Sequence, residues 1–195
     1  MNISMNDKEL IQKIAAKDHS AFKSLVDRYQ ALVINTCYNL LGNRQDAEDV
    51  AQEVFFQAYK SARNFRQEAK ISTWLYRIAV NRSLNFVRDN KRFRWLRSLS
   101  SLLEGGSQDV ADVLASDSDR PDVALENKER NAKIQKAIDS LPEKQRVAFV
   151  LHKYEGLPYE EIAKILQRSI SSVESLIHRA KSNLQRKLIH YLKEK

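Results

Sequence analysis

The amino-acid sequence predicts an all-α protein in which a flexible linker joins two small helical domains. Glycine and proline are scarce, with four and three copies in 195 residues, so turns are few and long helices are favoured. Apolar residues recur every three or four positions in two blocks, as in amphipathic helices. The stretch between the blocks is rich in serine and acidic residues. We therefore expect a first domain at 1–97, a linker at 98–122 and a second domain at 123–195.

The first block should contain four helices. Apolar spacing over residues 22–41 predicts one amphipathic helix, which Gly42 should end. A shorter helix should precede it, with Asn6 as its N-cap. Further helices are expected at about 46–62 and from 72 or 73 to about 90.

The linker and the second block follow. The linker combines serines with acidic residues and has only weak apolar periodicity, so we interpret it as a mobile acidic tether. It could shield basic surfaces of the neighbouring blocks, mimic nucleic acid inside a partner's channel, or serve as a solvated spacer. The second block should contain helices at about 123–139, after Pro142, at 159–166 and at about 171–192.

Composition narrows the function classes. The net charge of +8 and a pI near 9.5 favour a polyanionic partner such as nucleic acid. Cys37 is the only cysteine, which excludes an internal disulfide and a thiolate zinc cluster. The four histidines lie far apart in the sequence, and no metal site is expected. We find no signal-peptide pattern or bilayer-crossing stretch, which predicts a cytoplasmic protein without membrane insertion.

One face of the predicted third helix is unusual. At 100° per residue, Asp49, Gln52, Glu53 and Phe56 lie together, opposite the broad apolar side. An exposed phenylalanine among carboxylates gains nothing by burial unless a partner covers it. The face therefore predicts a protein-docking surface. The alternative is a chance surface phenylalanine among solubilising charges.

The predicted fourth helix has a face suited to nucleic acid. Trp74, Arg77, Asn81, Asn85 and Arg88 fall within a sector of about 80°. Arginine contacts phosphates, amides read base edges and tryptophan stacks on unpaired bases. A basic aromatic run follows directly. In the alternative reading, the tryptophan belongs to the core and the arginines are solvated.

The second block contains the pattern of a helix-turn-helix. It consists of a helix at 159–166, a polar turn and a long final helix. The final helix turns Ser171, Ser172, Ser175, Arg179 and Ser182 outward from its apolar stripe. Short hydroxyl side chains and an arginine near the N-terminus of a helix suit entry into the major groove.

These segments resemble the extracytoplasmic function (ECF) group of sigma-70 RNA polymerase sigma factors. Residues 46–55 (DAEDVAQEVF) are similar to the helix of conserved region two that binds the polymerase clamp helices. Residues 72–81 (STWLYRIAVN) are similar to the promoter-melting and minus-ten-reading segment. Residues 141–184 resemble conserved region four, which reads the minus-thirty-five element. The resemblance covers nearly the whole chain outside the linker.

The resemblance implies three sets of site residues. The set that would bind core RNA polymerase is Asp46, Asp49, Gln52, Glu53 and Phe56. A second set would open and read the minus-ten element: Phe65, Arg66, Trp74, Arg77, Asn81, Asn85 and Arg88. The loop at 64–71 would hold a flipped base. The set that would bind the minus-thirty-five element is Arg168, Ser171, Ser172, Ser175 and Arg179.

The chain departs from the family pattern in its second domain. A glycine that often follows the leucine of the turn is Gln167 here, and Glu174 and Leu176 stand where basic residues are common. Ser172, Ser175 and Arg179 are therefore the better candidates for reading bases.

The resemblance also implies three partners. These are core RNA polymerase, bound through its β′ clamp helices and β flap, promoter DNA, and an anti-sigma protein. It implies no cofactor and no catalytic residues.

Two other functions account for less of the sequence. An autonomous helix-turn-helix regulator would explain the second block but leaves the face around Phe56 unexplained. A metal-dependent nuclease would need clustered carboxylates, whereas those in this sequence are spread along helix surfaces and no glycine-rich phosphate loop accompanies them.

Overall fold

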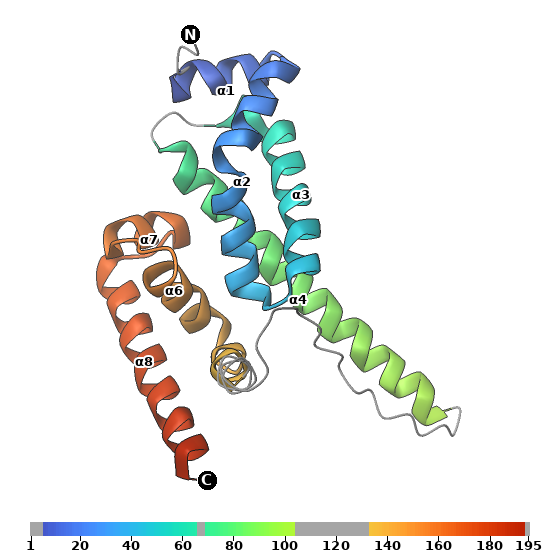
Figure 1. The fold of residues 1–195 in the computed structure, drawn as a ribbon, viewed down its shortest axis with the longest axis vertical. Helices are drawn as coiled ribbons and strands as arrows, with labels where there is room; N and C mark the ends of the chain where they lie inside the picture. The colour runs from blue at the N-terminus through green and yellow to red at the C-terminus, as the bar shows by residue number, and fades with distance from the viewer. Residues whose placement is uncertain (1–5, 66–68, 104–132, 194–195) are drawn as a thin grey trace, which may run out of the picture.

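The computed structural model describes residues 6–65, 69–103 and 133–193, and within these ranges the regular structure is helical, without a β-strand. The first half of the chain forms α1 (Asp7–Ala15), α2 (His19–Leu41), α3 (Arg44–Ser61), the short 3-10 helix η1 (Ala62–Asn64) and α4 (Ile71–Leu103). The second half forms a helical segment at 133–139, then α6 (Glu143–Lys153), α7 (Tyr159–Leu166) and α8 (Ile170–Lys193) (Figure 1). The all-α prediction is confirmed over the described residues.

Local chemistry sets the ends of the first two helices as the sequence predicted. The Asn6 side chain accepts a hydrogen bond from the backbone N–H of Lys8 at 3.2 Å, which caps α1. Gly42 ends α2 at φ +73°, and its N–H donates to the carbonyl of Tyr38 at 2.8 Å. This left-handed conformation favours glycine because a Cβ would clash with the backbone.

The third helix begins two residues before its expected start. Asn43 is its N-cap, and the Asn43 side chain accepts from the backbone N–H of Asp46 at 3.0 Å. A short polar side chain satisfies a donor that the first turn of a helix leaves unpaired. The capping bond therefore starts the helix at Arg44.

The fourth helix is longer than expected. It continues to Leu103, whereas the sequence pattern predicted an end near residue 90. The chain contains no glycine or proline between residues 71 and 104, so nothing interrupts helical hydrogen bonding once it has started. The expected linker start at 98 therefore lies inside α4. The remainder of the expected linker, and residues 123–132 of the helix expected after it, lie outside the described residues.

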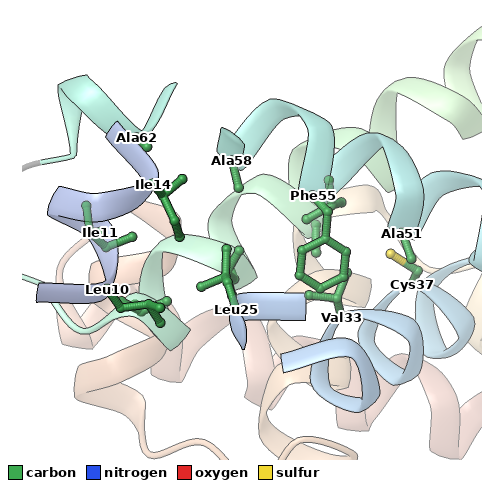
Figure 2. Close-up of a cluster of buried hydrophobic side chains, with 14 of the residues drawn as sticks. Leu10, Ile11, Ile14, Leu25, Val33, Cys37, Ala51, Phe55, Ala58 and Ala62 are labelled. Carbon is green, nitrogen blue, oxygen red and sulfur yellow. The ribbon is translucent and has the colours of Figure 1, made fainter. Parts of the chain in front are cut away.

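The first hydrophobic core lies between α1, α2, α3 and the beginning of α4. Figure 2 shows the side chains that meet there from the first three helices and η1. Leu10, Ile14 and Leu25 are fully buried, and Leu75 joins them from α4. Cys37 is also buried in this cluster.

The second hydrophobic core includes residues from both halves of the chain. Val147 and Leu151 of α6 and Ile165 of α7 belong to the same cluster as Tyr76 and Val80 of α4. Figure 1 shows α7 beside the first turns of α4, while the remainder of α4 extends away from the bundle. The two helical blocks are therefore packed against each other.

Candidate protein-docking and nucleic-acid interfaces

The docking face expected on α3 is exposed. Asp49, Gln52 and Glu53 are exposed together with Phe56, whose side chain is 58% exposed, the largest fraction among the exposed large hydrophobic residues described. The opposite side of α3 is buried, from Ala47 to Ala58. The amphipathic period of the helix thus places an aromatic ring and two carboxylates in solvent. Burying such a ring in an interface is worth about 1.5–3 kcal/mol.

Asp46 lies at the N-terminal end of this face and is half-buried. Burial raises the pKa of Asp46, and the charge of Asp49 adds to the rise. The carboxylates of this face therefore disfavour one another in the free chain. A cationic partner surface would relieve this repulsion.

Two cations that the sequence reasoning did not identify complete the docking face. The ammonium group of Lys60 lies 4.1 Å from the ring centroid of Phe56, a cation–π contact. Arg82 of α4 lies 3.6 Å from the Glu53 carboxylate and donates to the Gln57 side chain at 2.8 Å. The four-residue spacing from Phe56 to Lys60 could have revealed the first contact. The second depends on how α4 crosses α3.

The aromatic residue of the nucleic-acid face on α4 is partly in the core. Trp74 is half-buried, and its ring centroid lies 4.8 Å from that of Phe65. Both side chains pack against the first hydrophobic core. Trp74 therefore packs against Phe65 while it keeps part of its surface in solvent. Arg66 lies outside the described residues.

The polar residues of the same sector divide into two groups. Arg77 donates from its guanidinium to the carbonyl of Lys164 in α7 at 2.7 Å. Asn81 and Asn85 are exposed, and the Asn85 side chain accepts from Arg88 at 2.7 Å. The N-terminal part of the sector thus contacts the second domain, whereas the C-terminal part faces solvent.

The helix-turn-helix is formed by α7, a short turn and α8. Gln167 ends α7 in the left-handed conformation, at φ +53° and ψ +51°, which is the position where the family often has glycine. The Ser169 hydroxyl accepts from the backbone N–H of Ser172 at 3.2 Å and so caps α8. Both features give the turn the geometry that the sequence left open.

The side chains expected on the outward face of α8 lie outside its buried stripe. Ser171, Ser175 and Arg179 are exposed and Ser172 is half-buried. Val173 and Ile177 are buried beneath them, and Arg168 in the turn is exposed. The candidates for minus-thirty-five contacts thus lie on one accessible side, with Glu174 among them.

The described part of the chain offers no metal centre of the usual kind, because no three His, Cys, Asp or Glu side chains gather there. Among the described helices, none has the length and apolar character needed to span a membrane.

Comparison with known proteins accounts for both blocks. The family model for sigma-70 region 2 matches residues 25–93, and that for sigma-70 region 4 matches residues 131–184. The ECF RNA polymerase sigma factor SigW of Bacillus subtilis is 35% identical over 189 residues, which cover 95% of this chain and 98% of SigW. The RNA polymerase sigma-H factor of Pseudomonas aeruginosa is 34% identical over 188 residues, 96% of each chain.

A solved structure shares the fold. It is the sigma factor RpoE in complex with the anti-sigma factor NepR from Bartonella quintana, with a TM-score of 0.59 and 22% identity, covering 86% of this chain and 96% of that chain. The two family models lie in the order region 2 then region 4, and the relatives are about one-third identical over nearly their whole length. The chain therefore belongs to the sigma-70 family, in its ECF group of RNA polymerase sigma factors.

Proposed function

We propose that this chain binds core RNA polymerase and directs promoter-specific transcription initiation. The first domain would hold the clamp helices of the β′ subunit and open the minus-ten element. The second domain would contact the β flap and bind the minus-thirty-five element. The observation that carries this proposal is the exposed α3 face around Phe56, on the same chain as a helix-turn-helix with an accessible α8.

The site residues of this proposal are those expected from the sequence. On α3, exposed carboxylates surround an aromatic ring, a combination that fits a basic partner surface with an apolar pocket. On α4, Asn81 and Asn85 are exposed, and their amides are suited to base edges. On α8, Ser175 and Arg179 are exposed on the side opposite the buried stripe. The domain boundaries at 97 and 123 remain part of the proposal.

The chain would act by binding alone. Unstacking a base costs a few kcal/mol, and stacking on an aromatic side chain returns about 1–3 kcal/mol per base. No nucleotide hydrolysis, cofactor or catalytic residue is required. Such a factor would work in the cytoplasm with the transcription machinery, and membership in this family makes an anti-sigma protein a candidate partner.

The docking step can be tested with the double variant Glu53→Lys/Phe56→Ala. Loss of an aromatic anchor and reversal of one charge should cost at least about 2 kcal/mol, or about 30-fold in affinity for core polymerase. Asp27→Lys changes an exposed carboxylate on α2 and should leave the affinity unchanged. Circular dichroism checks that both variants are folded. Unchanged affinity of the double variant would reject the α3 face as the docking surface.

The opening step can be tested separately with Asn81→Ala. Run-off transcription from a cognate promoter should fall much more than binding to core polymerase, because Asn81 would act only on the opened DNA. Asn35→Ala, at an exposed amide of α2, is the matched control. Equal loss of transcription and polymerase binding would contradict this role.

The autonomous-regulator alternative is separated by a gel shift. A sigma factor should retain promoter DNA tightly only after core enzyme is added. Tight binding of duplex DNA by the free chain, with no affinity for core enzyme, would favour the alternative.

A further inference from the structure

Two residues of α8 depart from the family pattern, and the structure gives them different surroundings. Leu176 is half-buried and packs against the second hydrophobic core. Glu174 is exposed. Leu176 therefore contributes to the packing of the domain, whereas the carboxylate of Glu174 stays on the accessible side of the helix.

The rotation of α8 places Glu174 beside the face that is proposed to enter the major groove. Val173 and Ile177 are buried and fix the side of α8 that faces the domain interior. At 100° per residue, Glu174 lies about 40° from His178 and about 60° from Ser171, and both of these residues are exposed. Glu174 is the fifth residue of α8. Residues near the N-terminus of the second helix in a helix-turn-helix contact base edges, so Glu174 lies within reach of them.

Glu174 has none of the structural roles that a glutamate usually has in a helix. The first turn of α8 contains no acidic residue, so Glu174 lies beyond the turn where the helix dipole favours a carboxylate. The capping contact of α8 is made by the Ser169 hydroxyl and the N–H of Ser172. Among the ion pairs of the described residues, none includes Glu174. Its carboxylate is therefore available to a donor from outside the chain.

The charges around Glu174 are suited to DNA phosphates. Arg168, Arg179 and Lys181 are exposed in the turn and on α8, and such cations hold the DNA backbone. A carboxylate brought against the same backbone is repelled by the phosphates. Base edges in the major groove, in contrast, offer hydrogen-bond donors. An anion on this side of α8 therefore favours a contact with a base over a contact with the backbone.

The four bases differ in what their major-groove edges offer a carboxylate. Guanine presents two acceptors, and thymine presents an acceptor and a methyl group. Adenine has an amino donor, but its N7 acceptor lies beside that donor. Cytosine presents its N4 amino donor without an acceptor. Because an ionised carboxylate only accepts hydrogen bonds, it fits cytosine best.

We propose that Glu174 makes this chain specific for a cytosine in the minus-thirty-five element, by accepting a hydrogen bond from the cytosine N4 amino group. The proposal rests on the proposed function of α8 and adds the identity of one base to it. Any other base at that position places an acceptor near the desolvated carboxylate, which lowers the affinity. A basic residue in place of Glu174 would instead favour guanine.

The probe for this contact is a library of duplex promoters whose sequence is random upstream of the transcription start. Holoenzyme assembled from the full chain and core polymerase selects the promoters that it binds, and sequencing gives the enriched minus-thirty-five element. Each position of that element is then changed to the other three bases, one at a time, and relative affinities are measured by competition. The unmodified chain should prefer cytosine at one position by about tenfold, or about 1.4 kcal/mol.

Three substitutions of Glu174 should change the base that is preferred at that position. Glu174→Ala removes the acceptor and should reduce the preference to less than about twofold. Glu174→Gln should move the preference to adenine and Glu174→Arg should move it to guanine, because these side chains match the paired groups on those bases. Preferences at the other positions should stay the same. The control Glu160→Gln changes an exposed carboxylate of α7 and should leave every base preference unchanged.

Circular dichroism confirms that each variant is folded. A cytosine preference that survives in Glu174→Ala, or its absence in the unmodified chain, would overturn the proposal. Loss of affinity for core polymerase with unchanged base preferences would assign Glu174 to a protein contact and would also overturn it. A chain that forms no holoenzyme refutes the proposed function in the core-binding assay. Holoenzyme that selects promoters but keeps its base preferences in all three Glu174 variants refutes only the reading of cytosine by Glu174.

Discussion

Replacing Gln167 by glycine should stabilise the turn of the helix-turn-helix. Gln167 has φ +53° and ψ +51°, and its N–H donates to the Ala163 carbonyl at the end of α7. A residue with a Cβ in this left-handed region costs about 1–2 kcal/mol relative to glycine. The greater freedom of glycine in the unfolded chain offsets about 0.4–1 kcal/mol of that gain. The expected net gain is about 0.5–1 kcal/mol, or a few degrees in Tm for a small domain.

A reciprocal variant in the same domain tests the reasoning. Gly156 has φ +66°, and a Cβ placed on it would meet no atom within 4 Å. Gly156→Ala should therefore destabilise the fold through the backbone alone, by about the same amount as Gln167→Gly stabilises it. Urea denaturation followed by circular dichroism measures both free energies of unfolding. A lower urea midpoint for Gln167→Gly, or shifts of the same sign in both variants, would refute the backbone argument.

Two further predictions concern the first domain. Asn43→Ala removes the side chain that accepts from the Asp46 N–H, and should lower the free energy of unfolding by about 1 kcal/mol in urea denaturation; an unchanged midpoint would show that the cap contributes nothing. Burial raises the pKa of the Cys37 thiol to about 11, so the native protein at neutral pH holds it as the unreactive thiol. A thiol reagent should label Cys37 much more slowly in the native protein than in urea, and equal rates would contradict its burial.

Helical periodicity was sufficient to predict the features that lie on a single helix. The α3 face around Phe56 and the buried stripe of α8 follow from 100° per residue, and the structure exposes or buries these residues as expected. The bounds of α7, Tyr159–Leu166, also agree with the sequence, because Pro158 precedes the helix and its apolar residues have a regular spacing.

Other features could not be read from local pattern. The end of α4 was misplaced because its sequence changes character near residue 90 without containing a helix breaker. The left-handed conformation of Gln167 does not follow from its own side chain, because glutamine has no intrinsic preference for it; the glycine that the family resemblance implies at this position was the available hint. Residue types and spacing also gave no sign of which cations would lie beside Glu53.

By itself, the sequence determined an all-α chain of two helical blocks, the family to which it belongs, and the faces that we propose for docking and DNA binding. Each of these depends on the identity of residues close together along the chain. Only the tertiary structure decided that Glu161 lies against Thr73 and that Glu155 joins Asn39 to Tyr76. Partners so far apart in sequence meet through the burial of a shared apolar surface. The free energy of that burial depends on the shape of both domains together.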